Sequence, residues 1–187
     1  MNPQRRRPCA QGGFLLIEVL VTIVILAFGI LGLAGLQTRM QAAEVESYQR
    51  SQALIILDDM IARINANRAN AASYVTASPA GTGDTQPADC TTLTFGEARD
   101  LCEWSHELTG VGEQAGGSNA GAMIGGRGCI EQIAGSSPPA FRVTVAWQGL
   151  QSTVAPSLAC GAASYGDDSY RRAIAKTVAI GSLAPAP

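Results

Sequence analysis

The chain is poor in histidine. His106 is its only histidine, and Ser105 and Cys102 are the serine and the cysteine nearest to it in the sequence. Adjacent residues on a helix point apart and no carboxylate orients the pair, so Ser105 and His106 do not make a catalytic triad. A tetrahedral zinc site needs about four ligands, and no second Cys/His pair accompanies Cys102 and His106. We therefore expect no metal and no enzymatic activity.

Positive charge is also scarce. The 13 Lys and Arg residues oppose 15 Asp and Glu residues, which gives a formal net charge of −2 and no basic patch of the kind that binds nucleic acid. The glycine-rich stretch 116–128 lacks the Gly-Lys-Ser/Thr ending of a phosphate-binding loop. Asp167 and Asp168 supply too few oxygens for calcium and fit a solvated turn better. We therefore expect no nucleic acid partner and no cofactor.

One long stretch is almost free of charge. Between positions 14 and 36, Glu18 is the only charged residue, and about 20 apolar residues are enough to cross a bilayer as a helix. The three arginines at positions 5–7 predict a cytoplasmic N-terminus and an exported C-terminal part. The run is longer than the roughly 7–15 apolar residues of a cleavable secretory signal. A carboxylate inside such a span costs roughly 2.5–3.5 kcal/mol or more, so Glu18 indicates a function.

The residues around Phe14 resemble the class III leader of type IV pilins. A short basic leader ends in Gly13, Phe14 follows, and Glu18 is the fifth residue counted from Phe14. In that family a prepilin peptidase cuts after the glycine and methylates the new amino terminus. The resemblance therefore implies removal of residues 1–13 and an N-methylated Phe14. The threonine that usually follows the phenylalanine is Leu15 here.

Several segments beyond the leader are similar to minor pilins of the PilV type. They are Leu26 to Gln37, Asp100 to Trp104 with Leu108, Gly128 to Ile130, Val143 to Trp147, and Cys160-Gly161 followed by Tyr165 to Asp167. The resemblance implies a role in initiating and assembling type IV pili, at the tip with other minor pilins, in support of twitching motility and adhesion. The partners it implies are the prepilin peptidase, other minor pilins, the major pilin, the inner-membrane assembly platform and the lipid bilayer.

Glu18 has a physical role in this interpretation. It would lie four residues beyond the new amino terminus of Phe14, and positions four apart share a helix face. An acid near the helix start is also favoured by the helix dipole. Within hydrocarbon a carboxylate needs a partner, and the Phe14 amine of a neighbouring subunit, or its own, is a positive one. Such pairing would fix the axial register of stacked helices, whereas an unpaired acid reaching the membrane interface is the alternative.

Three glycines recur in the same segment, at positions 29, 32 and 35. They could allow close approach of another helix. They could equally loosen the helix, because glycine weakens a helix by about 1 kcal/mol relative to alanine. The sequence leaves both interpretations open.

The helix is expected to continue beyond the membrane, since no proline or glycine occurs in residues 37–70. An apolar stripe at helical spacing supports this, and so do two acid-before-base pairs four residues apart. The stripe is Leu54, Leu57, Ile61 and Ile64, and the pairs are Glu46 with Arg50 and Asp59 with Arg63. We predict one helix from Phe14 to about Ala69. Residues 14–36 form the transmembrane or filament-core part, and residues 37–70 are an amphipathic continuation.

Residues 71–187 are expected to form one periplasmic globular domain. A short helix is predicted for Leu93 to Leu108, with Thr94 and Glu97 as a capping box, and Trp104 and Trp147 as core anchors. Strands are predicted at Gly128 to Ile133, Phe141 to Leu150 and Ile174 to Ile180, with loops at Ser78 to Ala88 and Gly110 to Gly128. The predicted fold is therefore α+β and pilin-like, with the long N-terminal helix packed on an antiparallel sheet.

Four of the five cysteines remain once Cys9 leaves with the leader. An even number suits an exported domain, where disulfides persist, and four cysteines allow three pairings. The shorter loops close most easily, which favours Cys90 with Cys102 and Cys129 with Cys160.

Two other classes of protein share part of this pattern. A minor pseudopilin of a type II secretion system has the same leader, glutamate and fold. A periplasmic protein held by a single membrane span would have the apolar run without processing at Gly13. The mature N-terminus separates the second class from a pilin, and the phenotype of a deletion separates the first.

Overall fold

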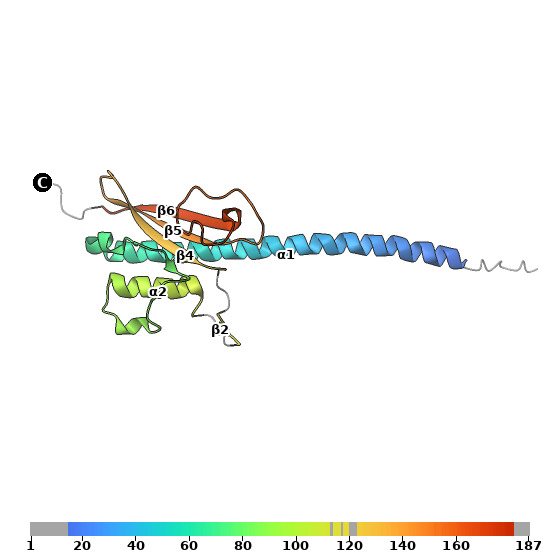
Figure 1. Cartoon of the computed structure of the whole chain (residues 1–187), viewed down its shortest axis with the longest axis horizontal. Coiled ribbons are helices and arrows are strands. Elements are labelled where there is room, and N and C mark those ends of the chain that lie inside the picture. The colour runs from blue at the N-terminus through green and yellow to red at the C-terminus, as the bar shows by residue number, and fades with distance from the viewer. Residues whose placement is uncertain (1–14, 113, 117, 120–122, 182–187) are drawn as a thin grey trace, which may run out of the picture. The chain divides into compact units, whose positions relative to one another are not determined.

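The computed structural model describes residues 15–112, 114–116, 118–119 and 123–181. Its longest element is α1 (Leu16–Ala66), drawn from blue to green in Figure 1. The chain divides into two compact units, Met1–Ala43 and Glu44–Pro187, and α1 contributes residues to both. The first unit holds the N-terminal part of α1. The second holds the rest of α1 and all the remaining elements.

The remaining elements follow α1 in the second unit. In chain order they are η1 (Arg68–Tyr74), β1 (Ala80–Gly81), η2 (Cys90–Thr92), α2 (Glu97–Thr109), β2 (Gln114–Ala115), β3 (Ser118–Asn119), β4 (Arg127–Ile133), β5 (Ala140–Gln148), η3 (Asp168–Tyr170) and β6 (Arg171–Ala179), where η marks a 3-10 helix. The main sheet has the strand order β1-β4-β5-β6 and every pairing in it is antiparallel. A row across it reads Ala80, Gly128, Val145 and Ile174. Strands β2 and β3 form a separate hairpin.

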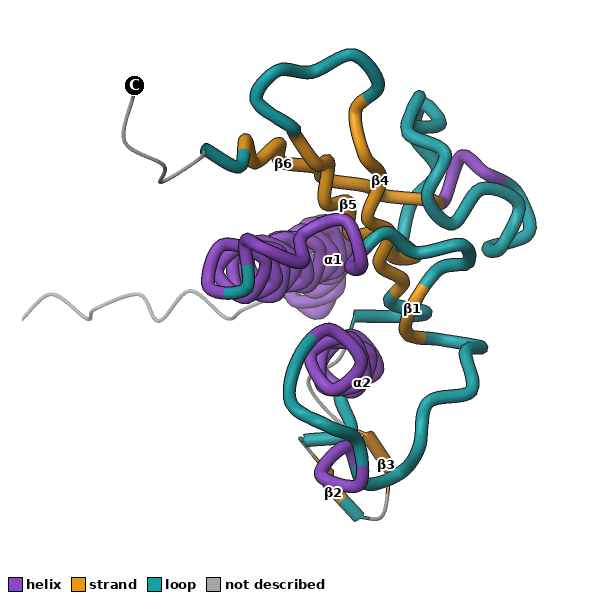
Figure 2. The backbone as a smooth tube through the Cα atoms, turned by 90° about the vertical axis from the view of Figure 1, so that its left-hand side faces the viewer, coloured by secondary structure: helices purple, strands orange, loops and turns teal. Residues whose placement is uncertain are grey.

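Both α-helices of the second unit cover the same face of this sheet, as Figure 2 shows. The core between them consists mainly of apolar side chains from α1, η1, α2, β4 and β5. Its largest fully buried members are Trp104, Tyr74, Phe141, Leu57, Met60, Ile64, Leu108, Ile130, Val143 and Val145. The long helix therefore supplies one wall of the core, and the α+β, pilin-like fold predicted from the sequence is confirmed.

A glycine on β4 allows α2 to pack closely on the sheet. A Cβ at Gly128 would lie 2.2 Å from Cη2 of Trp104, so the indole ring occupies the space that any other residue would fill. Trp104 is completely buried, and its Nε1–H donates to the carbonyl oxygen of Ile56 at 3.1 Å. One side chain of α2 thus contacts both α1 and the sheet. The predicted anchoring roles of Trp104 and Trp147 agree with their burial.

The opposite face of the sheet is covered by the loop between β5 and β6. The Cys129–Cys160 disulfide holds this loop against β4, with a Cα–Cα distance of 5.8 Å. A second disulfide, Cys90–Cys102, links η2 to α2 with a Cα–Cα distance of 5.7 Å. Both pairings are those that the shorter loops favour.

The helix boundaries differ from the predicted ones for local reasons. The helix α1 ends at Ala66 instead of near Ala69, because the Asn67 and Asn70 side chains hydrogen-bond each other (2.9 Å) and the chain turns into η1. The predicted capping box of α2 was wrong. The helix begins at Glu97 rather than Leu93, and its N-cap is Gly96, which makes no side-chain capping bond.

The packing of α1 was predicted in part. Leu57 and Ile64 are buried as expected, but Leu54 and Ile61 are only half-buried, and Ala53, Ile56 and Met60 complete the buried face. The Asp59–Arg63 pair forms at 2.5 Å, whereas the expected Glu46–Arg50 pair does not, because Glu46 binds Arg172 on β6 instead. The predicted loop Ser78 to Ala88 contains the buried strand β1, so that stretch is not entirely an exposed loop.

Candidate functional site

The candidate assembly site lies at the start of α1. Gly13 and Phe14 fall outside the described residues. Glu18 lies in the first turn of the helix, where its backbone N–H donates to the Leu15 carbonyl oxygen at 2.9 Å. Its side chain is exposed, and no other charged residue occurs from Leu15 to Thr38. Glu18 is therefore a single acid on an apolar helix surface, four positions after Phe14 in the sequence.

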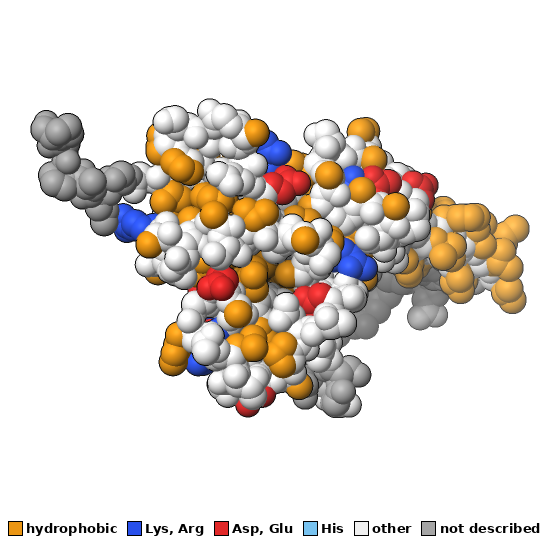
Figure 3. Space-filling view, turned by 60° about the vertical axis from the view of Figure 1, so that its left-hand side comes forward, with side chains coloured by type: hydrophobic (Ala, Val, Ile, Leu, Met, Phe, Trp, Pro, Cys, Tyr) orange, Lys and Arg blue, Asp and Glu red, His pale blue; other side chains and the backbone are white. Residues whose placement is uncertain are grey.

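The helix surface that follows Glu18 is apolar and open. Every residue from Leu15 to Gln41 is exposed, including the bulky side chains of Leu20, Ile25 and Leu31. By length and composition α1 is able to cross a membrane, and none of its most apolar window is buried in the chain itself. Figure 3 shows apolar side chains gathered on the N-terminal part of the helix. Such a surface requires lipid or other apolar helices around it.

The three glycines of this segment do not interrupt α1, which is helical throughout residues 29–35. A Cβ built on Gly29, Gly32 or Gly35 would meet no heavy atom within 4 Å. Gly32 and Gly35 line a shallow groove of about 340 Å³ together with Leu31, Leu36 and Arg39. Of the two interpretations that the sequence left open, a groove for close approach of another helix fits this geometry.

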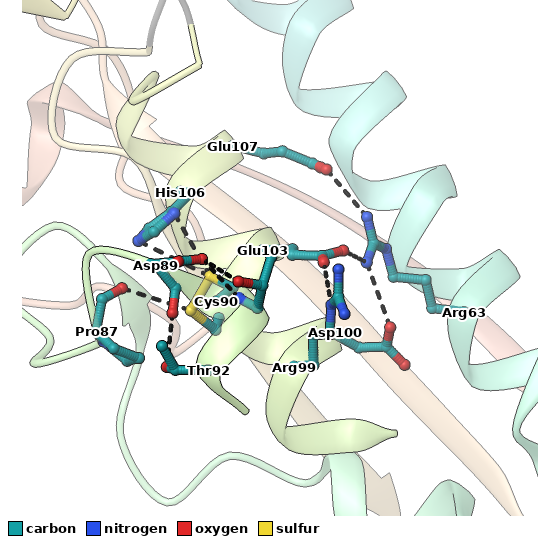
Figure 4. A network of polar contacts seen from close by, with 12 residues as sticks. Arg63, Pro87, Asp89, Cys90, Thr92, Arg99, Asp100, Glu103, His106 and Glu107 are labelled. Atoms are coloured by element: carbon teal, nitrogen blue, oxygen red, sulfur yellow. Dashed lines mark hydrogen bonds and ion pairs between the residues drawn. A yellow bond between two sulfur atoms is a disulfide. The ribbon is translucent and has the colours of Figure 1, made fainter. Parts of the chain in front are cut away.

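In the second unit, Arg63 is the centre of an ionic network between α1 and α2 (Figure 4). Its guanidinium binds Asp59 at 2.5 Å and three acids on one face of α2. These are Asp100 at 3.3 Å, Glu103 at 2.6 Å and Glu107 at 3.2 Å. Arg99 supports the network by binding the other oxygen of Glu103 at 2.8 Å. The network therefore links α2 to α1, in addition to the hydrogen bond between Trp104 and Ile56.

The charges in this network alter one another's ionisation. Burial alone would lower the pKa of Arg63, but the hydrogen bonds to Glu103 and Asp59 outweigh it and raise that pKa. Hydrogen bonds from Arg63 and Arg99 lower the pKa of Glu103. Burial, followed by repulsion from Asp59, raises the pKa of Glu107. Glu103 thus favours the folded state when ionised, and Glu107 opposes it.

Tyr74 extends the network on the side of η1. Its hydroxyl donates to Asp100 and accepts from Asn67 at 3.2 Å. Burial, together with the bond to Asp100, raises the pKa of Tyr74 to about 12. Seven titratable groups on three elements are therefore joined in one network.

The potential metal ligands do not form a metal centre in this fold. Ligand atoms of Cys90, Cys102 and His106 lie within 4.8 Å of one another. Both sulfur atoms belong to the Cys90–Cys102 disulfide, however, and are not thiolates that could bind a cation. His106 contacts Cys90 Sγ through Nδ1 at 3.5 Å, so the imidazole packs beside the disulfide.

The two acids of the loop after Cys160 are also used within the chain. Asp167 accepts from the Ser169 backbone N–H at 2.9 Å and caps η3. Asp168 binds Arg171 at 2.6 Å, and this hydrogen bond lowers the pKa of Asp168. These carboxylates therefore stabilise the turn that begins β6.

Sequence reasoning missed the network around Arg63 and the contacts of Glu46 with β6. The network could have been suspected from the spacing of Asp100, Glu103 and Glu107, which places three acids on one face of a short helix. Only the packing of α2 beside α1 identifies the cation that they share.

Comparison with known proteins gives one match. Residues 35–104 match the family described as Tt1218-like, type IV pilin Tt1218. The matched stretch runs from the last glycine of the apolar segment through the second half of α1 to Trp104 of α2. No curated protein and no solved structure matches the chain. The match supports a type IV pilin, a class of protein that assembles with other pilins.

Proposed function

We propose that this chain is a minor pilin of the PilV type that takes part in initiating and assembling type IV pili. The observation that carries the proposal is the exposed apolar part of α1, with its single acid Glu18 in the first turn. The same helix continues into a core that it shares with α2 and the sheet. The family match over residues 35–104 supports the pilin assignment.

The mechanism is non-covalent. Before processing, the leader and the apolar helix hold the subunit in the inner membrane, with the N-terminus in the cytoplasm and the globular domain in the periplasm. Cleavage after Gly13 by the prepilin peptidase exposes the amine of Phe14. Glu18 of one subunit then binds the Phe14 amine of the next, because an ion pair removes the cost of an isolated charge in an apolar medium. The subunit enters the helical bundle at the pilus tip with other minor pilins and with the major pilin.

The first test is the mature N-terminus. Mass spectrometry of protein purified from membranes is expected to find N-methylated Phe14 as the first residue. An unprocessed leader would contradict the proposal and support a single-span anchored periplasmic protein.

The second test is the role of Glu18. Glu18→Ala is expected to leave membrane insertion intact and to reduce incorporation into sheared pili, measured by immunoblot. Glu44→Ala is the matched control, since Glu44 is an exposed acid of the same helix beyond the apolar run. Normal piliation of the Glu18→Ala strain, with a deletion strain as reference, would refute the mechanism.

A minor pseudopilin of a type II secretion system remains the rival with the same leader and glutamate. The phenotype of the deletion strain separates the two. Loss of pili and twitching is expected here, whereas loss of exoenzyme secretion with normal pili would assign the chain to secretion.

A further inference from the structure

A pocket of about 370 Å³ lies in the second unit between α1 and the start of β6. One turn of α1 lines it with Glu46, Ser47 and Arg50, and β5 contributes Trp147. The loop after β5 and the first half of β6 close the other sides. The pocket is thus bounded by polar residues of the helix and by an aromatic side chain of the sheet.

Two of the three arginines in its wall bind acids and carbonyl oxygens of the chain itself. Arg171 is 2 % exposed, binds Asp168 at 2.6 Å and donates to three carbonyl oxygens of the loop. Arg172 binds Glu46 at 3.1 Å and donates to Gln151 O at 2.7 Å. The carboxylate of Glu46 is occupied as well, because its Oε1 also accepts the backbone N–H groups of residues 150 and 151. Arg171 and Arg172 are therefore both held by groups of the chain, and the charge of Arg172 is balanced by Glu46.

Arg50 and Trp147, unlike Arg171 and Arg172, have polar groups without a partner in the part of the chain that the structure describes. Arg50 is exposed and makes no ion pair or side-chain hydrogen bond with any residue that the structure describes. Trp147 is 4 % exposed, and its Nε1–H has no acceptor among the described residues. A buried donor without a partner is costly, typically by about 1–3 kcal/mol. The pocket therefore holds one guanidinium without an internal partner, and Trp147, whose indole N–H is buried, forms part of its wall.

The charges around the pocket define the kind of ligand. Three arginines (Arg50, Arg171 and Arg172) oppose Glu46 and Asp168, so one positive charge is in excess. A single negative charge would neutralise this excess, whereas a dianion such as phosphate would exceed it and leave the pocket with a net negative charge. The planar guanidinium of Arg50 matches a carboxylate in a two-bond geometry. Ligand pockets begin at about 300 Å³, so the space also admits the carbon atoms that carry the carboxylate.

We propose that this pocket binds an Asp or Glu side chain of a partner polypeptide. Arg50 would hold the carboxylate in a two-bond geometry, and Trp147 would form the wall of the pocket against which the carbon atoms of the acidic side chain pack. Under the proposed function, on which this choice of partner rests, the acidic side chain belongs to a neighbouring pilin subunit. The contact is separate from the Glu18 pairing, because it lies in the second unit and uses a cation of this chain.

Binding is tested on the full chain in uncharged detergent, with ¹⁵N-labelled tryptophan. The probes are the tripeptide acetyl-Gly-Glu-Gly-amide, its Gln counterpart and inorganic phosphate. The Glu tripeptide is expected to shift the Trp147 indole resonance in a saturable way and to leave that of Trp104 in place. Arg50→Gln should weaken this binding at least tenfold. Arg68→Gln, which removes another exposed cation without an ion pair among the described residues, should leave it unchanged.

Three results would overturn the proposal. The first is a shift of the Trp147 resonance with the Gln tripeptide that equals the shift with the Glu tripeptide. The second is an equal shift with phosphate at the same concentration. The third is unchanged binding of the Glu tripeptide by Arg50→Gln. Because Arg50 is exposed, its replacement should not disturb folding, which the unchanged Trp104 resonance would confirm.

A second measurement separates this proposal from the function of the chain. Arg50→Gln should be processed normally but incorporate less well into pili than Arg68→Gln. If the wild-type chain does not enter pili at all, the proposed function fails, while the peptide titration still decides the pocket. If Arg50→Gln incorporates as well as Arg68→Gln, the pilin partner is excluded even though the function stands.

Discussion

Gly128→Ala should destabilise the second unit, although it adds only one methyl group. The new Cβ would lie 2.2 Å from Cη2, 2.5 Å from Cζ3 and 2.7 Å from Cζ2 of Trp104. Carbon atoms pack best at about 3.5–4.0 Å, so the indole ring would have to retreat by more than 1 Å. It cannot do so freely, because it is completely buried and its Nε1–H is bound to Ile56 O at 3.1 Å.

The size of the effect follows from these contacts. Overpacking a tight core costs about 1–3 kcal/mol, and loss of the indole hydrogen bond adds about 0.5–1.5 kcal/mol. Replacing glycine also restricts the unfolded chain, which returns about 0.4–1 kcal/mol. We therefore expect the free energy of unfolding to fall by about 1–4 kcal/mol for Gly128→Ala. Gly112→Ala is the control, since a Cβ there meets nothing within 4 Å, and its effect should stay within about 0.5 kcal/mol.

A double-mutant cycle tests the stated cause. Trp104→Phe removes the ring atoms that the new Cβ would meet, so Gly128→Ala should cost at least about 1 kcal/mol less in that background. Urea unfolding of the full chain in detergent, followed by far-UV circular dichroism, measures all four proteins with the same probe, because two of them lack Trp104. Effects of the two changes that add within about 0.5 kcal/mol would refute the reasoning, because contacting residues must couple.

Four further predictions concern charge, covalent links and processing. Ionised Glu103 stabilises the fold because its pKa is lowered from the ordinary 4.5, so this contribution is lost as the pH falls through the lowered pKa. Glu103→Gln should therefore be less stable than wild type at pH 7. In urea unfolding at a series of pH values, the variant should lose less stability on acidification than wild type does. Glu107 has the opposite sign because its pKa is raised above 4.5, so Glu107→Gln should be no less stable than wild type at pH 7, and a clear loss there would contradict the assignment. Removing the Cys129–Cys160 disulfide, whose cysteines are 31 residues apart, should lower the free energy of unfolding by about 4 kcal/mol. Removing Cys90–Cys102, whose cysteines are 12 residues apart, should lower it by about 3 kcal/mol, because a shorter loop restricts the unfolded chain less. Thermal unfolding of the two double Cys→Ala variants measures both losses, and the reverse order would reject this explanation. Gly13→Leu should block cleavage of the leader, so a normal gel shift of that variant on co-expression with a prepilin peptidase would exclude Gly13 as the cut site.

The sequence was informative where structure follows from local pattern. The absence of proline and glycine in residues 37–70 predicted the continuation of α1, and alternation of β-branched and aromatic residues located β5. The short strand β1 could not be found this way, because Ala80 and Gly81 have no strand preference and pair with β4 only through the tertiary fold. The start of α2 was missed because Thr94 and Glu97 fit a capping pattern, whereas Gly96 and the Cys90–Cys102 link set the actual boundary.

Long-range polar contacts were the least predictable part of the candidate sites. Glu46 and Arg50 have the spacing of a helical ion pair, yet Glu46 binds Arg172, a residue 126 positions away. That choice depends on the register of β6 against α1, which no pattern within the helix contains. The same choice leaves Arg50 without an internal partner, and the proposed carboxylate pocket is a consequence of it.

Arg63 and Glu18 differ in whether their charges are paired within the subunit. Arg63 is surrounded by four carboxylates of its own subunit, so its ionic contacts stabilise the second unit and require no partner. Glu18 has no cation beside it among the described residues, on a surface that is apolar for several turns. Taking that carboxylate into lipid or into a helical bundle is unfavourable until another molecule, or the processed terminus, supplies a positive charge. Under the proposed function, the Glu18 pair thus fixes the register of neighbouring subunits, whereas the ion pairs of Arg63 act within one subunit.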